Sequence, residues 1–275
     1  MAFPIFQVDA FTHIPYRGNP AAVVILDKMQ PDDWLKSVAA EMNLSETAFL
    51  APNKDPFVRV WQLRWFTPSK EVELCGHATL ATAHVMFSEG YAKPNETIRF
   101  GSLSGELQAS KDSGGWIELD FPTSKIEPVE SVESVATAIG FKPVGLYKAT
   151  FDKDFDYLVQ VESDEQVREI SPDQSAIISL GSRALTITAK AAPGSEGSPD
   201  FVSRVFAPNV GVPEDPVTGS AHCYLSAFWA EKLGKTELKA HQVSARGGTL
   251  KVTLDADRTK IAGRAVTILK GSLLK

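Results

Sequence analysis

The chain has 275 residues, of which 43% are hydrophobic and 23% charged, as is typical of a soluble globular protein. Its net charge of −6 and the scattering of its lysines and arginines argue against nucleic acid or an anionic membrane as a partner. The N-terminus shows no basic segment followed by an apolar stretch, so we expect no secretory signal and no membrane span. The cysteines, Cys75 and Cys223, fit a reducing cytoplasm better than a disulfide framework.

The first half of the sequence predicts short strands and two helices. Residues 31–43 are typical of a helix, because Pro31 suits a first turn and two acidic residues follow it. The apolar face of that helix is formed by Trp34, Leu35, Val38 and Met42. A second helix should begin at Gly76 and end at Gly90. Strands are expected at 5–11, 20–26, 46–52, 57–66, 96–100, 105–110 and 115–121.

The second half predicts a similar order of elements. Residues 121–130 are polar and interrupted twice by proline, so we expect a linker there between two halves, 1–122 and 123–275. This division leaves open that the last strand of the second half returns to pair with strands of the first half. Helices are expected at 132–139 and from Gly219 to Gly234. Strands are expected at 144–149, 155–161, 184–191, 200–206, 237–244 and 249–254.

One motif occurs twice, as RWFTPSKEVELCGHAT (64–79) and RVFAPNVGVPEDPVTGSAH (204–222). Arg64, Phe66 and Pro68 recur at an offset of 140 (204 − 64), and Gly76 and Ala78 recur at an offset of 143 (219 − 76). The offset of 143 holds again for Gly105 and Leu107, which recur as Gly248 and Leu250. Matches at a nearly fixed offset across a helix and the following hairpin indicate an internal duplication.

The two helices that follow the repeated motifs are apolar on all sides. Such a helix is typically buried, so we expect each to fill the centre of a half-closed sheet. Its N-terminus then presents unpaired amide groups and the positive end of the helix dipole. If an approximate twofold relates the halves, both N-termini point into one shared cleft, an arrangement suited to binding a carboxylate.

Four sequence blocks resemble the signatures of the PhzF-like phenazine-biosynthesis family, and the likeness is greatest to the phenazine biosynthesis-like domain proteins. The blocks are GNPAAV (18–23), NLSETAF (43–49), EVELCGHAT (71–79) and EDPVTGSAH (214–222). This resemblance implies the diaminopimelate-epimerase fold, an α+β architecture of two similar halves, each with a central helix wrapped by a mostly antiparallel sheet. It also implies a homodimer.

The resemblance implies that Glu46 is the catalytic acid–base group, with His77 and Asp215 contacting the substrate and tuning the glutamate. From the residues alone, a glutamate such as Glu46 is usually a solvated surface residue, and His77 and Asp215 are also plausible as helix-start and turn residues. The expected substrate-binding residues are Asn19, Gly76, Gly219 and Ser220. The Gly-Asn-Pro motif around Asn19 is also ordinary turn chemistry.

Cys75 bears on the mechanism. In related amino-acid epimerases, two cysteines at the symmetric helix starts act as opposed acid and base. Here the position matching Cys75 is Thr218, and an alcohol cannot replace a thiolate near neutral pH. A two-thiol racemase is therefore disfavoured, and Cys223 is expected to be a core residue.

The sequence predicts an enzyme that needs no cofactor and no metal. It has no Cys/His set with zinc spacing, no Walker loop and no Rossmann glycine fingerprint in a strand–helix context. The leading hypothesis is an isomerase that moves a proton within a small carboxylate. Two alternatives stay open: an epimerase or racemase of an amino-acid-like substrate, and a non-catalytic protein that keeps the cleft for ligand sensing or for a protein partner.

Overall fold

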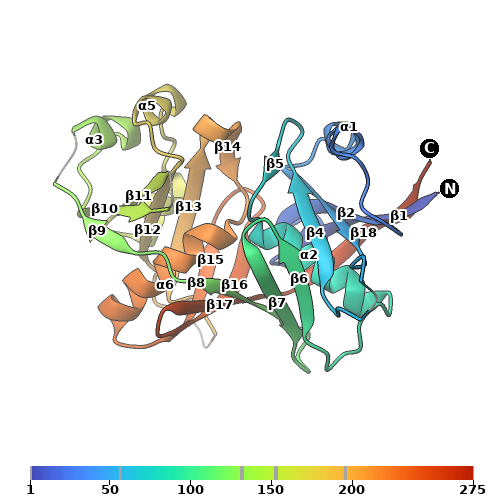
Figure 1. Cartoon of the computed structure of the whole chain (residues 1–275). Coiled ribbons are helices and arrows are strands. Elements are labelled where there is room, and N and C mark those ends of the chain that lie inside the picture. Colours follow the sequence, from blue (N-terminus) through green and yellow to red (C-terminus); the bar gives the residue numbers. More distant parts are fainter. Residues whose placement is uncertain (1, 56, 131–132, 152–153, 195–196, 275) are drawn as a thin grey trace. The chain divides into compact units, whose positions relative to one another are not determined.

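The structure is a computed structural model that describes residues 2–55, 57–130, 133–151, 154–194 and 197–274 (Figure 1). The chain divides into two units. The first comprises Met1–Phe121 with Lys260–Lys275, and the second comprises Pro122–Thr259. The end of the chain belongs to the first unit because β18 (Ala265–Leu273) pairs antiparallel with β1 (Phe3–Ala10) along its length.

The strands of the first unit pair in one mostly antiparallel arrangement. The exceptions are the parallel pairs β2–β3 and β4–β6. Besides β1 and β18, the strands are β2 (Asn19–Ile25), β3 (Glu46–Ala51), β4 (Trp61–Phe66), β5 (Glu71–Val72), β6 (Ile98–Ser102), β7 (Gly105–Lys111) and β8 (Ile117–Pro122). The boundary with the second unit falls within β17 (Arg258–Gly263).

Helix α2 (Gly76–Ser88) is the buried helix of the first unit and packs on β1, β2, β3 and β18. Its two buried threonines are satisfied inside the helix, because Thr79 and Thr82 donate to the carbonyls of Cys75 (2.6 Å) and Ala78 (2.7 Å). A helix so enclosed cannot shift without disrupting the core, so its first turn is held in a fixed position.

Helix α1 (Asp32–Met42) begins after Pro31 and ends at Asn43, whose left-handed conformation (φ 49°) stops the helix. Leu35, Val38 and Ala39 are buried on one face. Trp34 and Met42, both on the predicted apolar face, pack at the edge of the same core. Because Glu46 lies three residues after Asn43, the end of α1 sets where β3 starts.

The second unit repeats the scheme of the first. Its strands are β9 (Ile126–Pro128), β10 (Gly145–Thr150), β11 (Phe155–Gln160), β12 (Ala184–Lys190), β13 (Phe201–Ala207), β14 (Val212–Asp215), β15 (Glu237–Gln242) and β16 (Gly248–Asp255). Its helices are α3 (Glu133–Ile139), α4 (Asp164–Glu169), α5 (Gln174–Ser179), the 3-10 turn η1 (Pro208–Val210) and α6 (Gly219–Leu233).

Strand pairing shows the duplication directly. The parallel pair β2–β3 corresponds to β11–β12, and the parallel pair β4–β6 corresponds to β13–β15. The antiparallel pairs match in the same way, with β3–β4 corresponding to β12–β13 and β6–β7 corresponding to β15–β16. Helix α6, like α2, is buried along most of its length. The expected α+β fold of two similar halves is confirmed.

The repeated Arg-x-Phe residues perform the same structural task in both units. Arg64 forms two hydrogen bonds to the carboxylate of Glu71 (2.7 and 2.6 Å), and its guanidinium lies 5.1 Å from the ring of Phe66. Arg204 forms two bonds to Glu214 (2.7 and 3.0 Å) and lies 4.9 Å from the ring of Phe206. These bidentate pairs fasten β4 and β13 to the segments that lead into α2 and α6.

Some expectations differ from the structure, and the strands β5, β14 and β17 were not expected. The strand expected at 57–66 is shorter, because the Asp55 carboxylate accepts a hydrogen bond from the amide of Phe57 (2.9 Å) and β4 starts only at Trp61. The expected linker contains β9, which pairs with β10. Helices α4 and α5 were not expected, because each has six residues and shows too little periodicity in the sequence. Residues 131–132, at the start of the helix expected there, lie outside the described part of the chain.

Among the described residues, no helix combines the length and the apolar character needed to cross a membrane.

Candidate active site

Glu46 is the first residue of β3, and its side chain is 17% exposed. The residues that follow it, Thr47 to Ala51, are all buried. The register of the parallel pair sets Glu46 beside Ala21 of β2. A largely buried strand thus carries a partly accessible carboxylate at its end, which is a suitable place for a group that meets a substrate.

His77 is the second residue of α2, and it is 5% exposed. Its Nε2 lies 3.3 Å from Oε2 of Glu46 without the alignment of a hydrogen bond. Its Nδ1 lies 3.5 Å from Sγ of Cys75, the N-cap residue of the helix. Burial lowers the pKa of His77 to about 3, so the ring is neutral near pH 7. The structure therefore brings together two of the three predicted catalytic residues, Glu46 and His77.

The third, Asp215, ends β14 in the second unit. Its Oδ2 accepts a hydrogen bond from the hydroxyl of Thr218 (2.5 Å). Gln242 holds the same loop, since its Nε2 donates to the carbonyl of Asp215 (2.7 Å) and its Oε1 accepts from the amide of Thr218 (2.9 Å). Gln242 was not among the site residues predicted from the sequence. A sequence signal that could have identified Gln242 is its position in β15, where it alternates with Leu238 and Ala240 on the buried face.

Ser220 lies in the first turn of α6, next to Arg183 (3.5 Å from Nη2 to Oγ). Arg183 is held by Asp156, which is fully buried and accepts from Nε (2.9 Å) and Nη2 (2.5 Å) of the guanidinium. The hydroxyl of Tyr224 also donates to Asp156 (3.1 Å), and Phe151 stacks on the guanidinium at 4.6 Å. A fixed positive charge therefore stands beside the start of α6. No sequence pattern marks Arg183, because it lies in a loop before β12.

Asn19 is buried and opens β2. The preceding Gly18 has a φ of 66°, and a Cβ there would come within 2.1 Å of the carbonyl oxygen of Ala10. Only glycine fits that position, so at least the first residue of the Gly-Asn-Pro motif serves the turn. The substrate-binding role of Asn19 stays a prediction.

Helix starts of the two units correspond residue by residue. Cys75 is the N-cap of α2 and Thr218 is the N-cap of α6, and each helix begins with a glycine, Gly76 or Gly219. In both, a side chain in the first turn bonds back to the N-cap carbonyl: Thr79 through Oγ1 (2.6 Å) and His222 through Nδ1 (2.7 Å). The duplicated scaffold thus presents two similar helix starts with different side chains.

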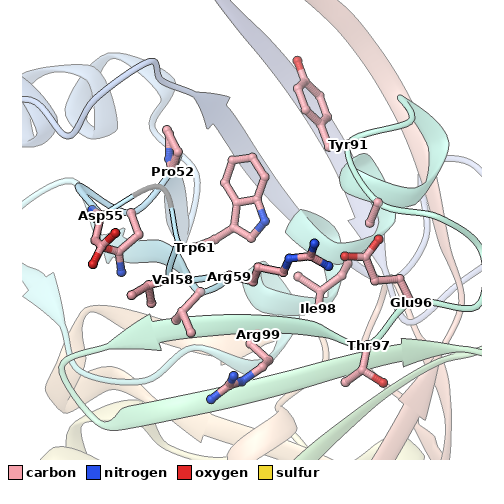
Figure 2. A pocket seen from close by; sticks show the side chains of 13 residues that line it. Pro52, Asp55, Val58, Arg59, Trp61, Tyr91, Glu96, Thr97, Ile98 and Arg99 are labelled. Atoms are coloured by element: carbon pink, nitrogen blue, oxygen red, sulfur yellow. Dashed lines mark hydrogen bonds between the residues drawn. The ribbon is translucent and has the colours of Figure 1, made fainter.

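A cavity of about 480 Å³ also opens in the first unit, lined by Asp55, Val58 and Arg59 together with residues of β4 and β6 (Figure 2). Figure 2 shows Trp61 and Tyr91 on its wall, with ring centroids 6.5 Å apart, and Arg59 and Glu96 beside them. Its described lining includes neither Glu46 nor His77. The cavity is therefore separate from the contacts between those two residues.

Residues 8–271 match the model of the phenazine biosynthesis-like protein family. The chain belongs to this family. It is 44% identical, over 100% of its length and 99% of the relative, to an uncharacterised isomerase of Halalkalibacterium halodurans. It is 42% identical to the human phenazine biosynthesis-like domain-containing protein, over 99% of each chain.

A solved structure of a PhzF-family protein from Enterococcus faecalis superposes with a TM-score of 0.90, at 39% identity and complete coverage of both chains. At 20% identity, a Pseudomonas aeruginosa protein described as a predicted epimerase shares the fold (TM-score 0.75). The family expected from the four sequence blocks is confirmed, and the names of the relatives support an isomerase.

Proposed function

We propose that the chain is a cofactor-independent isomerase that moves a proton within a small carboxylate substrate, with Glu46 as the general acid and base. The observation that carries this proposal is the contact of the Glu46 carboxylate with the neutral, buried ring of His77 at 3.3 Å. A carboxylate on a rigid strand, partly open to solvent and next to a neutral hydrogen-bonding ring, is suited to repeated proton transfer.

In the proposed reaction, the Glu46 carboxylate takes a proton from one carbon of the substrate while the C–H electron pair delocalises into the adjoining unsaturated system. The resulting carboxylic acid returns the proton to a second carbon, and the enzyme ends as it began. Neutrality of His77 matters for this cycle. A charged imidazolium at this distance would stabilise the carboxylate as an ion pair and make it a weaker base.

The substrate carboxylate is proposed to bind at the helix starts, through the amides near Gly76, Gly219 and Ser220. Unpaired amides and the helix dipole favour an anion at such positions. Arg183 strengthens the proposal for α6, since its guanidinium stands 3.5 Å from Ser220 Oγ and is oriented by a buried carboxylate. Asp215 is proposed to contact polar groups of the substrate. That both helix starts serve one substrate stays a prediction, as do the homodimer and the cytoplasmic location.

A two-thiol epimerase is not favoured by the structure. The N-cap equivalent to Cys75 is Thr218, whose hydroxyl donates to Asp215. The other cysteine, Cys223, lies inside α6, where burial raises the pKa of its thiol to about 12. A thiol in that state supplies no thiolate near neutral pH.

Solvent deuterium incorporation tests the proposal. Unsaturated small carboxylates that raise the melting temperature of the chain are incubated with it in D₂O and analysed by mass spectrometry and NMR. We expect deuterium at carbon and a shifted double bond. Inversion at a single carbon would indicate the epimerase alternative, and binding without any exchange would indicate a non-catalytic protein.

A further inference from the structure

Three side chains with metal-binding chemistry meet at the start of α2. Glu46 offers a carboxylate oxygen, Cys75 a sulfur and His77 a ring nitrogen, and these atoms all lie within 4.8 Å of one another. Cys75 and His77 are buried, and Glu46 is partly buried. The sequence showed no zinc spacing because the third donor, Glu46, lies far from the other two along the chain and reaches them only through β3.

The unpaired ring nitrogen of His77 indicates that a ligand binds at this place. The side chain is 5% exposed, and its Nε2 has no hydrogen-bond partner in the structure although it faces Oε2 of Glu46 at 3.3 Å. Buried polar atoms are nearly always satisfied, so an orphaned ring nitrogen facing a carboxylate calls for a further group between or beside them. A neutral imidazole nitrogen with a lone pair is among the commonest metal ligands.

We propose that Glu46, Cys75 and His77 form a binding site for a thiophilic divalent cation of the Zn²⁺ type. Zinc bonds of about 2.0–2.3 Å in a tetrahedral arrangement hold the ligand atoms roughly 3.3–3.7 Å apart. The 3.3 Å between His77 Nε2 and Glu46 Oε2 already matches such an edge. The sulfur completes the set by turning from Nδ1 of the ring, now 3.5 Å away, toward the metal.

Three protein ligands leave the fourth tetrahedral position open to water or to a small anion. The thiolate and the imidazole select zinc or cobalt against Mg²⁺, which prefers oxygen ligands. One consequence rests on the proposed function: a metal bound to Glu46 occupies the carboxylate that would move the proton, so metal binding and turnover exclude each other. The site would make the enzyme sensitive to free zinc.

The binding test uses the full chain and needs no substrate. Co²⁺ is titrated into the protein to look for the thiolate-to-cobalt absorption band in the near ultraviolet, and Zn²⁺ affinity is measured by competition with a chelating indicator dye. The variants are Cys75→Ser and the matched control Cys223→Ser, whose sulfur lies in the other unit and outside this group of donors. Mg²⁺ serves as the hard-cation control.

We expect one Zn²⁺ per chain, a cobalt–thiolate band, and no binding of Mg²⁺. Cys75→Ser should weaken Zn²⁺ by more than about 100-fold, because losing even a supporting group beyond the ligands costs roughly 10–100-fold. Cys223→Ser should bind as the unaltered chain does. Absence of the band, equal zinc affinity in Cys75→Ser, or equal binding of Mg²⁺ would overturn the proposal.

Two features keep the result interpretable. The cobalt band of the unaltered chain does not depend on whether any variant folds. Glu46→Gln removes a second ligand without touching sulfur, so it should weaken zinc while retaining a cobalt–thiolate band, and unchanged zinc affinity would also count against the site. Because these measurements involve no turnover, the metal site can be upheld while the proposed isomerase activity fails, and the reverse.

Discussion

Replacing Glu46 by glutamine removes the proposed proton shuttle while leaving the shape of the site. The amide has the same size as the carboxylate, and it can still contact Nε2 of His77 across the present 3.3 Å. Since burial lowers the pKa of His77 to about 3, the ring is uncharged near neutrality and the substitution breaks no ion pair. We therefore expect the free energy of unfolding to change by no more than about 1 kcal/mol, the size of one ordinary hydrogen bond.

The effect on turnover should be far larger. A general acid–base group contributes about 10²–10⁴-fold, which corresponds to roughly 3–5 kcal/mol of barrier at 1.36 kcal/mol per tenfold change. A group that both takes and returns the proton stands at the upper end of that range. Glutamine can do neither, because its amide does not exchange a proton with carbon near neutral pH.

The assay compares deuterium incorporation into a bound carboxylate for the parent chain, Glu46→Gln and the control Glu73→Gln. Glu73 precedes the same helix start but is exposed, so its variant should exchange at the parent rate. Ligand affinity measured by calorimetry should be similar in all three. If Glu46→Gln exchanges at the parent rate, Glu46 is not the shuttle, and His77 or Asp215 becomes the leading base.

Three further predictions concern single substitutions. Cys75→Ala should lower the rate of deuterium exchange by less than the ~100-fold that an acid–base group contributes, because the equivalent N-cap is Thr218 and no second thiol stands there. A larger loss of exchange rate, with folding unchanged, would restore a thiol mechanism. Arg204→Met should lower the free energy of urea unfolding by about 3 kcal/mol, because it leaves the Glu214 carboxylate without its bidentate partner. A change below about 1 kcal/mol would show that the Arg204–Glu214 pair contributes no more than an exposed ion pair. His222, fully buried, has a pKa lowered by burial from 6.5 to about 4, so the unfolded chain binds more protons between these values and stability falls by about 3 kcal/mol as the pH drops from 6.5 to 4. His222→Thr keeps a bond to the N-cap carbonyl, as Thr79 does in the other unit. This variant should lose the fall of about 3 kcal/mol in the free energy of urea unfolding between pH 6.5 and pH 4. If its unfolding free energy depends on pH as that of the parent chain does, His222 is not the group responsible.

The fold was expected from the resemblance of four sequence blocks to a known family, and the repeated motif independently indicated two similar halves. The glycines that follow α2 and α6, Gly90 and Gly234, both have positive φ, as expected for glycines that stop a helix. Contacts that depend on the tertiary fold could not be predicted from the sequence. Arg183 reaches Ser220 only because a strand pair brings Asp156 beside it, and nothing in a loop sequence encodes that approach.

The candidate site could be predicted in part for the same reason. Glu46 and His77 lie in recognisable sequence blocks, but their contact is made by the register of β3 and the burial of α2. Gln242 was missed because a glutamine at the end of a strand is usually exposed, whereas here it is buried and bonds to the loop before α6. The metal-binding group at the start of α2 was missed because zinc spacings describe local ligand pairs and not a strand-borne third donor.

What the duplication kept and what it changed follow different physical rules. The Arg–Glu pairs and the phenylalanines under the guanidinium groups fasten each helix start to its sheet, so a change in either copy would loosen its own unit. The side chains of Cys75 and Thr218 do not cap their helices, since the first-turn side chains of both helices bond to the backbone carbonyl of the N-cap residue. Those positions were therefore free to diverge, one toward a thiol and an imidazole beside Glu46, the other toward hydroxyls beside Asp215 and Arg183. A symmetric scaffold thus carries an asymmetric set of groups, as the proposed reaction with Glu46 as its one acid–base residue requires.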